Sequence, residues 1–188
     1  VPARPLEDPQ MAQVLRAVEL MLVNHEPFPA LAIDRAWNIR MANKAFGRLY
    51  ALLGPEEWGG GDGAPRNLMR LFFHPAGLRK WATNWEQIAP LLWCRAEREA
   101  EAAGGEEMKR VLAELRPHVD PATIWAAEAA ALLPVLPMTL VIGMTRISLF
   151  TVNATFGTAV DVTAEELRIE FLFPADAGTE RMLRTGEA

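Results

Sequence analysis

The spacing of apolar residues changes from a helical period to strict alternation in the last third of the chain. Apolar side chains occupy every second position of the segment 167–173, which is the pattern of a strand with one buried face. The apolar runs 138–142 and 147–152, joined across Gly143, predict two further strands. An antiparallel meander at the end of the chain must bury one face, so the preceding segments have to cover it.

A second strand-forming region lies near the start of the chain. The apolar run 30–33 is followed by a turn that begins at Asp34 and by alternating apolar residues from Trp37 to Met41. This pattern predicts a hairpin. Asn43 is a favoured helix N-cap and predicts a helix directly after it.

Helical periodicity dominates the region between the hairpin and the final strands. Apolar residues recur at spacings of three and four, which predicts helices within 9–23, 43–53, 67–73, 108–115 and 121–133. We predict a longer helix whose apolar face is formed by Trp81, Trp85, Ile88 and Leu92. Pro90 predicts a kink in it, because proline has no N–H to donate. The glycine-rich segment 59–65 predicts a surface loop.

The order of these elements predicts the fold class. A helix, two strands, several helices, three strands and a short final helix indicate an α+β fold that is PAS-like. Its expected core is one antiparallel sheet of about five strands, with helices inserted between the hairpin and the three-stranded meander.

Composition excludes several classes of function. The formal charge of −5 disfavours direct binding of nucleic acid. The apolar runs are shorter than the roughly 20 residues of a membrane-spanning helix, so we expect no membrane partner. Cys94 is the only cysteine, which fits a reducing compartment, and we expect a cytoplasmic protein. Nucleophile, zinc and nucleotide motifs are missing, so we expect no enzyme, no metal and no cofactor.

Residues 29–43 resemble the opening hairpin of PAS domains, in which a strand, a turn that begins with Asp, a second strand and a helix-initiating Asn follow one another. More specifically, the chain resembles the ligand-binding domain of MmyB-like bacterial transcription regulators. The similarity continues through His25–Pro29, Asn67–Pro75, Asn84–Trp85, Thr155–Thr163 and Phe173–Asp176.

This resemblance implies a sensory domain that follows a DNA-binding helix-turn-helix domain. We expect a linker or coupling helix at 1–28, the PAS-like ligand-binding domain at 29–184 and a tail at 185–188. The upstream helix-turn-helix domain is expected to be absent from this chain and to make all contacts with DNA. We expect a homodimer, because DNA half-sites are read by two-fold symmetry.

The expected ligand site is an apolar pocket between the helices and the sheet. We predict that it is lined by Phe150 and Phe171 of the sheet and by Trp81, Trp85, Ile88, Leu92, Leu71, Phe72, Met41 and Phe46. A small apolar ligand, for example a fatty acid, suits this lining, because each buried CH₂ contributes about 0.8 kcal/mol. For the aromatic face, plain core packing is the alternative.

A carboxylate on such a ligand would require a cation. The candidates are Arg70, Arg79 and Arg95, because guanidinium pairs with carboxylate through two parallel hydrogen bonds; the alternative for each is a solvated surface position. His74 is a further candidate ligand contact, and its alternative role is to cap the end of a helix.

Two functions from different classes remain open at this stage. The first is a sensor that binds an apolar molecule and modulates DNA binding, and the second is a ligand-independent dimerisation module of the same regulator. An enzyme acting on a lipid or aromatic substrate ranks third. An elongated apolar cavity ending at an arginine favours the sensor, whereas a fully packed core favours the dimerisation module.

Overall fold

The computed structural model of this 188-residue chain describes residues 9–53, 66–102, 105–122, 137–156 and 167–186. The loop expected at 59–65 lies outside the described residues, as does the helix expected at 121–133 apart from 121 and 122. The elements in chain order are α1 (Pro9–Asn24), β1 (Ala30–Ile33), β2 (Ile39–Ala42), α2 (Lys44–Leu52), α3 (Leu68–Phe73), η2 (Leu78–Lys80), α4 (Trp85–Glu101), α5 (Glu106–Leu115), η3 (Arg116–His118), β3 (Met138–Ile142), β4 (Thr145–Ala154), β5 (Arg168–Pro174) and α8 (Ala177–Thr185).

The five strands form one antiparallel sheet in the order β2-β1-β5-β4-β3. The hairpin and the three-stranded meander are both present, which confirms the predicted α+β, PAS-like fold. The last strand, β5, lies in the middle of the sheet, where Phe171 pairs with Ala30 of β1 and Phe173 pairs with Phe150 of β4. An early strand, β1, and the last strand, β5, are therefore neighbours within the sheet.

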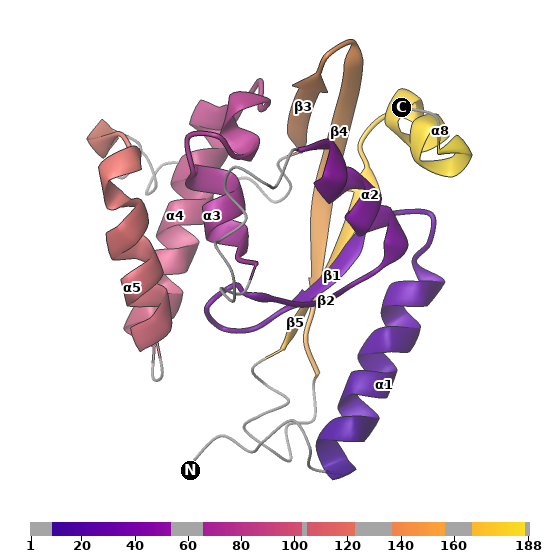
Figure 1. Cartoon of the computed structure of the whole chain (residues 1–188), viewed down its shortest axis with the longest axis horizontal. Helices are drawn as coiled ribbons and strands as arrows, with labels where there is room; N and C mark the ends of the chain where they lie inside the picture. Colours follow the sequence, from indigo (N-terminus) through magenta and orange to yellow (C-terminus); the bar gives the residue numbers. More distant parts are fainter. Residues whose placement is uncertain (1–8, 54–65, 103–104, 123–136, 157–166, 187–188) are drawn as a thin grey trace.

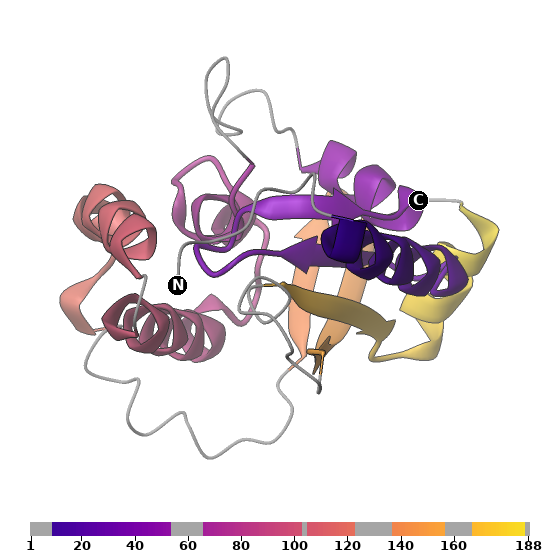
Figure 2. The same cartoon turned by 90° about the horizontal axis from the view of Figure 1, so that it is seen from below.

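Helices pack against both faces of this sheet. Figures 1 and 2 show α1 on one side and α4 and α5 on the other. The larger core joins α2, α3, α4 and α5 to residues such as Leu31, Ile147 and Leu149. The smaller core joins Val18 and Leu22 of α1 to the opposite face. In β1 and β5, successive residues therefore pack alternately into the larger and the smaller core.

Polar side chains define where the short helices begin. Asn43 accepts from the Phe46 N–H at the start of α2, Asn67 caps α3, and Asp176 caps α8. Asn and Asp are favoured at these positions because they satisfy N–H groups that have no partner within the helix. Hydrogen bonding from Thr179 lowers the pKa of the Asp176 carboxyl, so the cap stays charged at neutral pH.

The long helix begins later than its sequence pattern predicts. Trp81 lies before α4 and joins β3 instead, since its carbonyl accepts from the Val141 N–H at 2.9 Å. Asn84 also bonds to this strand region, through Pro137 and Thr139. Tertiary pairing with an edge strand thus replaces the predicted first helical turn. The helix itself runs as one element from Trp85 through Pro90 to Glu101.

Candidate functional site

A cavity of about 70 Å³, called the interior cavity below, lies between the sheet and helices α2 and α3, and its lining extends to the exposed Thr151. Most of its walls are apolar, and they come from four strands, both helices and η2. The lining residues are Leu31, Phe46, Leu49, Tyr50, Leu53, Leu68, Leu71, Phe72, Leu78, Met138, Leu140, Leu149, Thr151, Glu170 and Leu172. Such a lining favours an apolar occupant over a charged one.

Glu170 is the charged side chain of this lining, and it is only 8% exposed. Its Oε1 accepts from Arg168 Nε at 3.2 Å, and Arg168 Nη1 in turn donates to Glu99 Oε1 of α4 at 2.7 Å. Trp37 Nε1 donates to the other oxygen of Glu99. A polar network thus connects the cavity wall on β5 to the helical layer.

Tyr50 supplies a phenol to the same cavity. Burial raises the pKa of this phenol, and the nearby Arg66 guanidinium, 5.1 Å from the ring centroid, partly opposes that effect. The phenol therefore stays protonated at neutral pH, and a protonated phenol can both donate and accept a hydrogen bond.

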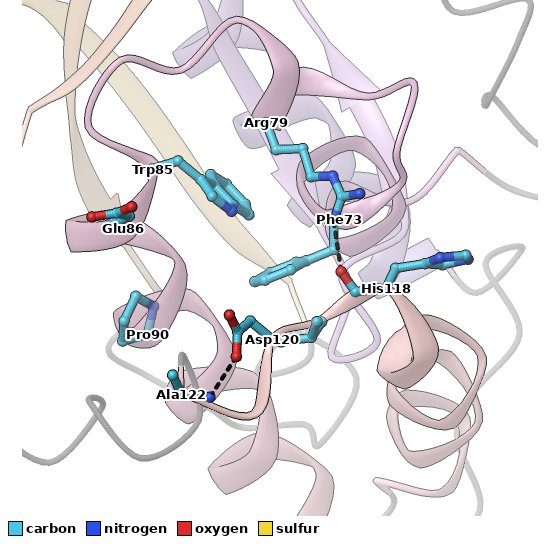
Figure 3. A pocket seen from close by; sticks show the side chains of 9 residues that line it. Phe73, Arg79, Trp85, Glu86, Pro90, His118, Asp120 and Ala122 are labelled. Carbon is cyan, nitrogen blue, oxygen red and sulfur yellow. Dashed lines mark hydrogen bonds between the residues drawn. The ribbon is translucent and has the colours of Figure 1, made fainter.

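A second hollow, the lateral pocket, opens beside α4 and has a volume of about 450 Å³. Figure 3 shows it between the start of α4 and the segment after η3. It is lined by Phe73, Arg79, Trp85, Glu86, Pro90, His118, Val119, Asp120 and Ala122. Its volume lies in the range of roughly 300–1,000 Å³ that is typical of small-molecule sites, and the interior cavity is smaller than that range.

The predicted ligand-site residues are divided between these two places. Phe46, Leu71 and Phe72 line the interior cavity, whereas Arg79 and Trp85 line the lateral pocket. Trp81 and Leu92 pack on the larger core, and Ile88 is buried. The single aromatic-walled pocket expected from the sequence is therefore two separate hollows.

Three predicted lining residues lie on the wrong face of the sheet. Met41 and Phe171 pack against the smaller core with α1, and Phe150 stacks on Phe173 at 5.5 Å between ring centroids. In β4 and β5 the residues next to Phe150 and Phe171 in the sequence, such as Leu149 and Leu172, face the interior cavity instead. The expectation that α4 meets Phe150 and Phe171 across a cavity is therefore wrong.

The three candidate arginines are engaged with partners of the protein itself. Arg70 forms two hydrogen bonds with Glu114, at 2.9 and 2.8 Å. Arg95 bonds to Glu99 and lies over the Trp37 ring. Arg79 donates to the His118 carbonyl at 2.6 Å, and it is the one of the three that lines a pocket.

His74 is the C-cap residue of α3, where its backbone N–H, and not its ring, bonds to the Arg70 carbonyl. Its Nδ1 accepts from the Ala76 N–H at 3.2 Å, directly after α3. The ring lies 6.1 Å from the ring of His118, between centroids, and lines neither hollow.

The Arg70–Glu114 pair predicts a small pH dependence of stability. Hydrogen bonding to Arg70 lowers the pKa of the Glu114 carboxyl. Its contribution is therefore present above the unfolded-state pKa and is lost as the pH falls through the lower folded-state pKa. Because Glu114 is half exposed, we expect about 0.5 kcal/mol. Urea unfolding between pH 6 and about pH 3 should show a shallower acid decline for Glu114→Gln; an unchanged decline would contradict this role.

Glu99, Arg168 and Glu170 were missed by the sequence reasoning as site residues. The charged positions of 167–173 follow the alternation of a strand with one solvated face, so the pattern places them in water. The signal that could have located them is Leu172, an apolar residue in the same phase as Arg168 and Glu170, which indicates that this face of β5 is covered as well.

The chain was also compared with known proteins. The family model described as MmyB-like transcription regulator ligand binding domain matches residues 14–185. None of the curated proteins compared with the chain matches it significantly. Among the described residues, no three His, Cys, Asp or Glu side chains are grouped as metal ligands, and no helix is both long and apolar enough to cross a bilayer.

Proposed function

Because this chain belongs to the family of MmyB-like transcription regulator ligand binding domains, we propose that it binds a small, mainly apolar molecule in the interior cavity. Binding then modulates contact with DNA by a helix-turn-helix domain of the same cytoplasmic regulator. The observation that supports this most directly is the apolar lining contributed jointly by the sheet, α2 and α3. An apolar occupant gains free energy from each CH₂ that it buries there.

A fatty acid is the ligand we propose. Its chain matches the apolar walls. Its carboxylate needs a cationic donor, and Arg168, which lies outside the lining, is bonded to the lining carboxylate of Glu170. Arg168 Nη2 is buried and has no hydrogen-bond partner. A ligand oxygen that reaches this N–H satisfies it, which is favourable because an unmade buried hydrogen bond costs about 1–3 kcal/mol.

The small volume of the cavity suggests how binding becomes a signal. At about 70 Å³ it accepts only part of an acyl chain, so a longer chain fits when α2 or α3 moves from the sheet. A ligand that binds the opened state more tightly shifts the population towards it. The shift is limited by the difference between the two affinities.

A series of saturated acids tests this proposal. Hexanoic, octanoic and decanoic acid should bind the purified chain with affinities that rise about fourfold for each added CH₂, measured by calorimetry. Leu71→Trp should lower the affinity for decanoic acid at least tenfold, because the larger side chain fills the cavity. Leu52→Trp, on the exposed side of α2, should leave that affinity unchanged. Circular dichroism confirms that both variants fold. Affinity independent of chain length would overturn the proposal.

The native ligand is tested separately by mass spectrometry of an organic extract of the purified chain. A stoichiometric fatty acid, absent from a control protein of the same host, is the expected result. An empty chain that also fails to bind added acids would remove the sensor proposal in favour of the second candidate.

That second candidate is a ligand-independent homodimerisation module, and α1 favours it. Leu20, Met21 and Val23 remain 54%, 40% and 61% exposed on this helix, although Val18 and Leu22 are buried against the sheet. Exposed apolar side chains grouped on one element are typical of association surfaces. Leu20→Asp with Val23→Asp should convert a dimer to a monomer in light scattering. An unchanged mass would exclude α1 as the interface.

A further inference from the structure

The lateral pocket has a rigid aromatic floor. Phe73 is 1% exposed, and its ring meets those of Trp85 and Trp93 edge to face, at centroid distances of 5.0 and 5.3 Å. Buried Pro90 and Val119 complete the apolar walls. Rings held by their neighbours lose little conformational entropy when a ligand packs on them, so this floor is preorganised to bind an apolar group.

Opposite charges lie on two sides of this floor. Figure 3 shows Phe73 and Trp85 between Arg79 on one side and Asp120 on the other. One N–H of Arg79 is used by the His118 carbonyl, at 2.6 Å, and one oxygen of Asp120 accepts from the Ala122 N–H, at 2.8 Å. These bonds fix both groups. A guanidinium has five N–H donors and a carboxylate has two oxygens, so both retain hydrogen-bonding capacity for a ligand.

Pro90 interrupts the hydrogen bonding of α4 beside the same pocket. In an uninterrupted helix the residue at position 90 donates its N–H to the carbonyl of Glu86, four residues earlier, and proline has no such donor. Glu86 and Pro90 both line the pocket. The Glu86 carbonyl therefore lacks its usual helical donor.

From this arrangement we infer that the lateral pocket is a second binding site, selective for a free α-amino acid with an apolar or aromatic side chain. The α-carboxylate pairs with Arg79, the α-ammonium with Asp120, and the side chain packs on Phe73 and Trp85. A simple anion is repelled by Asp120 and by the exposed Glu86 carboxylate, and a simple cation by Arg79, so Arg79 and Asp120 together favour a zwitterion.

The interior cavity and the lateral pocket are both lined by α3 and η2, but by different residues of these elements. In α3, Leu71 and Phe72 face the interior cavity whereas Phe73 faces the lateral pocket, and in η2 Leu78 and Arg79 divide in the same way. The amino-acid site is therefore independent of the proposed fatty-acid site in its contacts. Each can be tested when the other fails.

Three small-molecule probes that share one aromatic group test the inference. Phenylalanine, 3-phenylpropionate and 2-phenylethylamine share a phenyl ring and differ in which charges they have. Calorimetry on the purified chain should show phenylalanine binding at least tenfold more tightly than either of the others, because each lacks one charge-assisted contact. Equal affinities for all three, or no binding of phenylalanine at millimolar concentration, overturns the inference.

Two variants assign the charges. Asp120→Asn keeps an oxygen for the Ala122 N–H and removes only the charge. It should lower the affinity for phenylalanine at least tenfold and should not lower the affinity for 3-phenylpropionate. Arg79→Gln should lower the affinities for phenylalanine and 3-phenylpropionate but not the affinity for 2-phenylethylamine. Arg98→Gln, an exposed substitution on α4 outside the pocket, is the matched control. If Arg79→Gln fails to fold, the Asp120→Asn result alone decides, and unchanged phenylalanine affinity there refutes the site.

Discussion

Asn43→Ala is expected to lower the free energy of unfolding by about 3–4 kcal/mol, because one buried side chain joins four segments of the chain. Asn43 is 7% exposed. Its Oδ1 accepts from the N–H groups of Ala30 and Phe46, at 3.0 and 2.9 Å, and its Nδ2 donates to the carbonyls of Leu22 and Phe28, at 3.2 and 2.8 Å. Loss of a helix cap costs about 1 kcal/mol, and each additional buried group left unpaired costs about as much or more.

Urea unfolding of Asn43→Ala, Asn43→Asp and the exposed control Asn24→Ala measures these contributions. Aspartate keeps both accepted bonds but cannot donate to the Leu22 and Phe28 carbonyls, so it should also destabilise. Asn24 makes one exposed bond to Leu20, and its loss should cost less than about 0.5 kcal/mol. A loss below about 1 kcal/mol for Asn43→Ala would show that water replaces these bonds.

Asn43 also illustrates which interactions a sequence can predict. Its cap on α2 involves a residue only three positions away and follows from local preference. The bond to the end of α1 spans 21 positions, and no periodicity indicates it. Helix starts and strand segments were predicted well for this reason, whereas the contacts that join them were not.

The assignment of sheet faces failed for a related reason. Alternation in 167–173 correctly predicts β5 and divides its side chains into two sets. It does not say which set faces which helices, because both faces of this central strand are covered. Phe171 was therefore placed in the pocket, although Glu170 lines it. The helical residues Phe46, Leu71 and Phe72 do line the interior cavity, and their contact with a ligand stays a prediction.

Arg168→Met is expected to lower the free energy of unfolding by about 3 kcal/mol. The substitution removes the cation between Glu170, which is buried, and Glu99, and it also removes the guanidinium 5.1 Å from the Trp37 ring centroid. Removing one partner of a buried pair costs about 3–5 kcal/mol, because the remaining charge is uncompensated. The lower end applies here, as the Glu99 side chain is 27% exposed and keeps Arg95 as a partner.

The double variant Arg168→Met, Glu170→Gln separates the cost of the lone carboxylate from the value of the pair. Removing the Glu170 charge should return at least half of the lost free energy, because the remaining Glu99 retains Trp37 and Arg95. Glu101→Gln, an exposed substitution on α4, is the control and should change stability by less than about 0.5 kcal/mol. If the double variant is no more stable than Arg168→Met, the network stabilises the fold by packing of the arginine on Trp37 rather than by charge. In that case a ligand carboxylate near Arg168 would gain little, and the proposed fatty acid would be held by its chain alone.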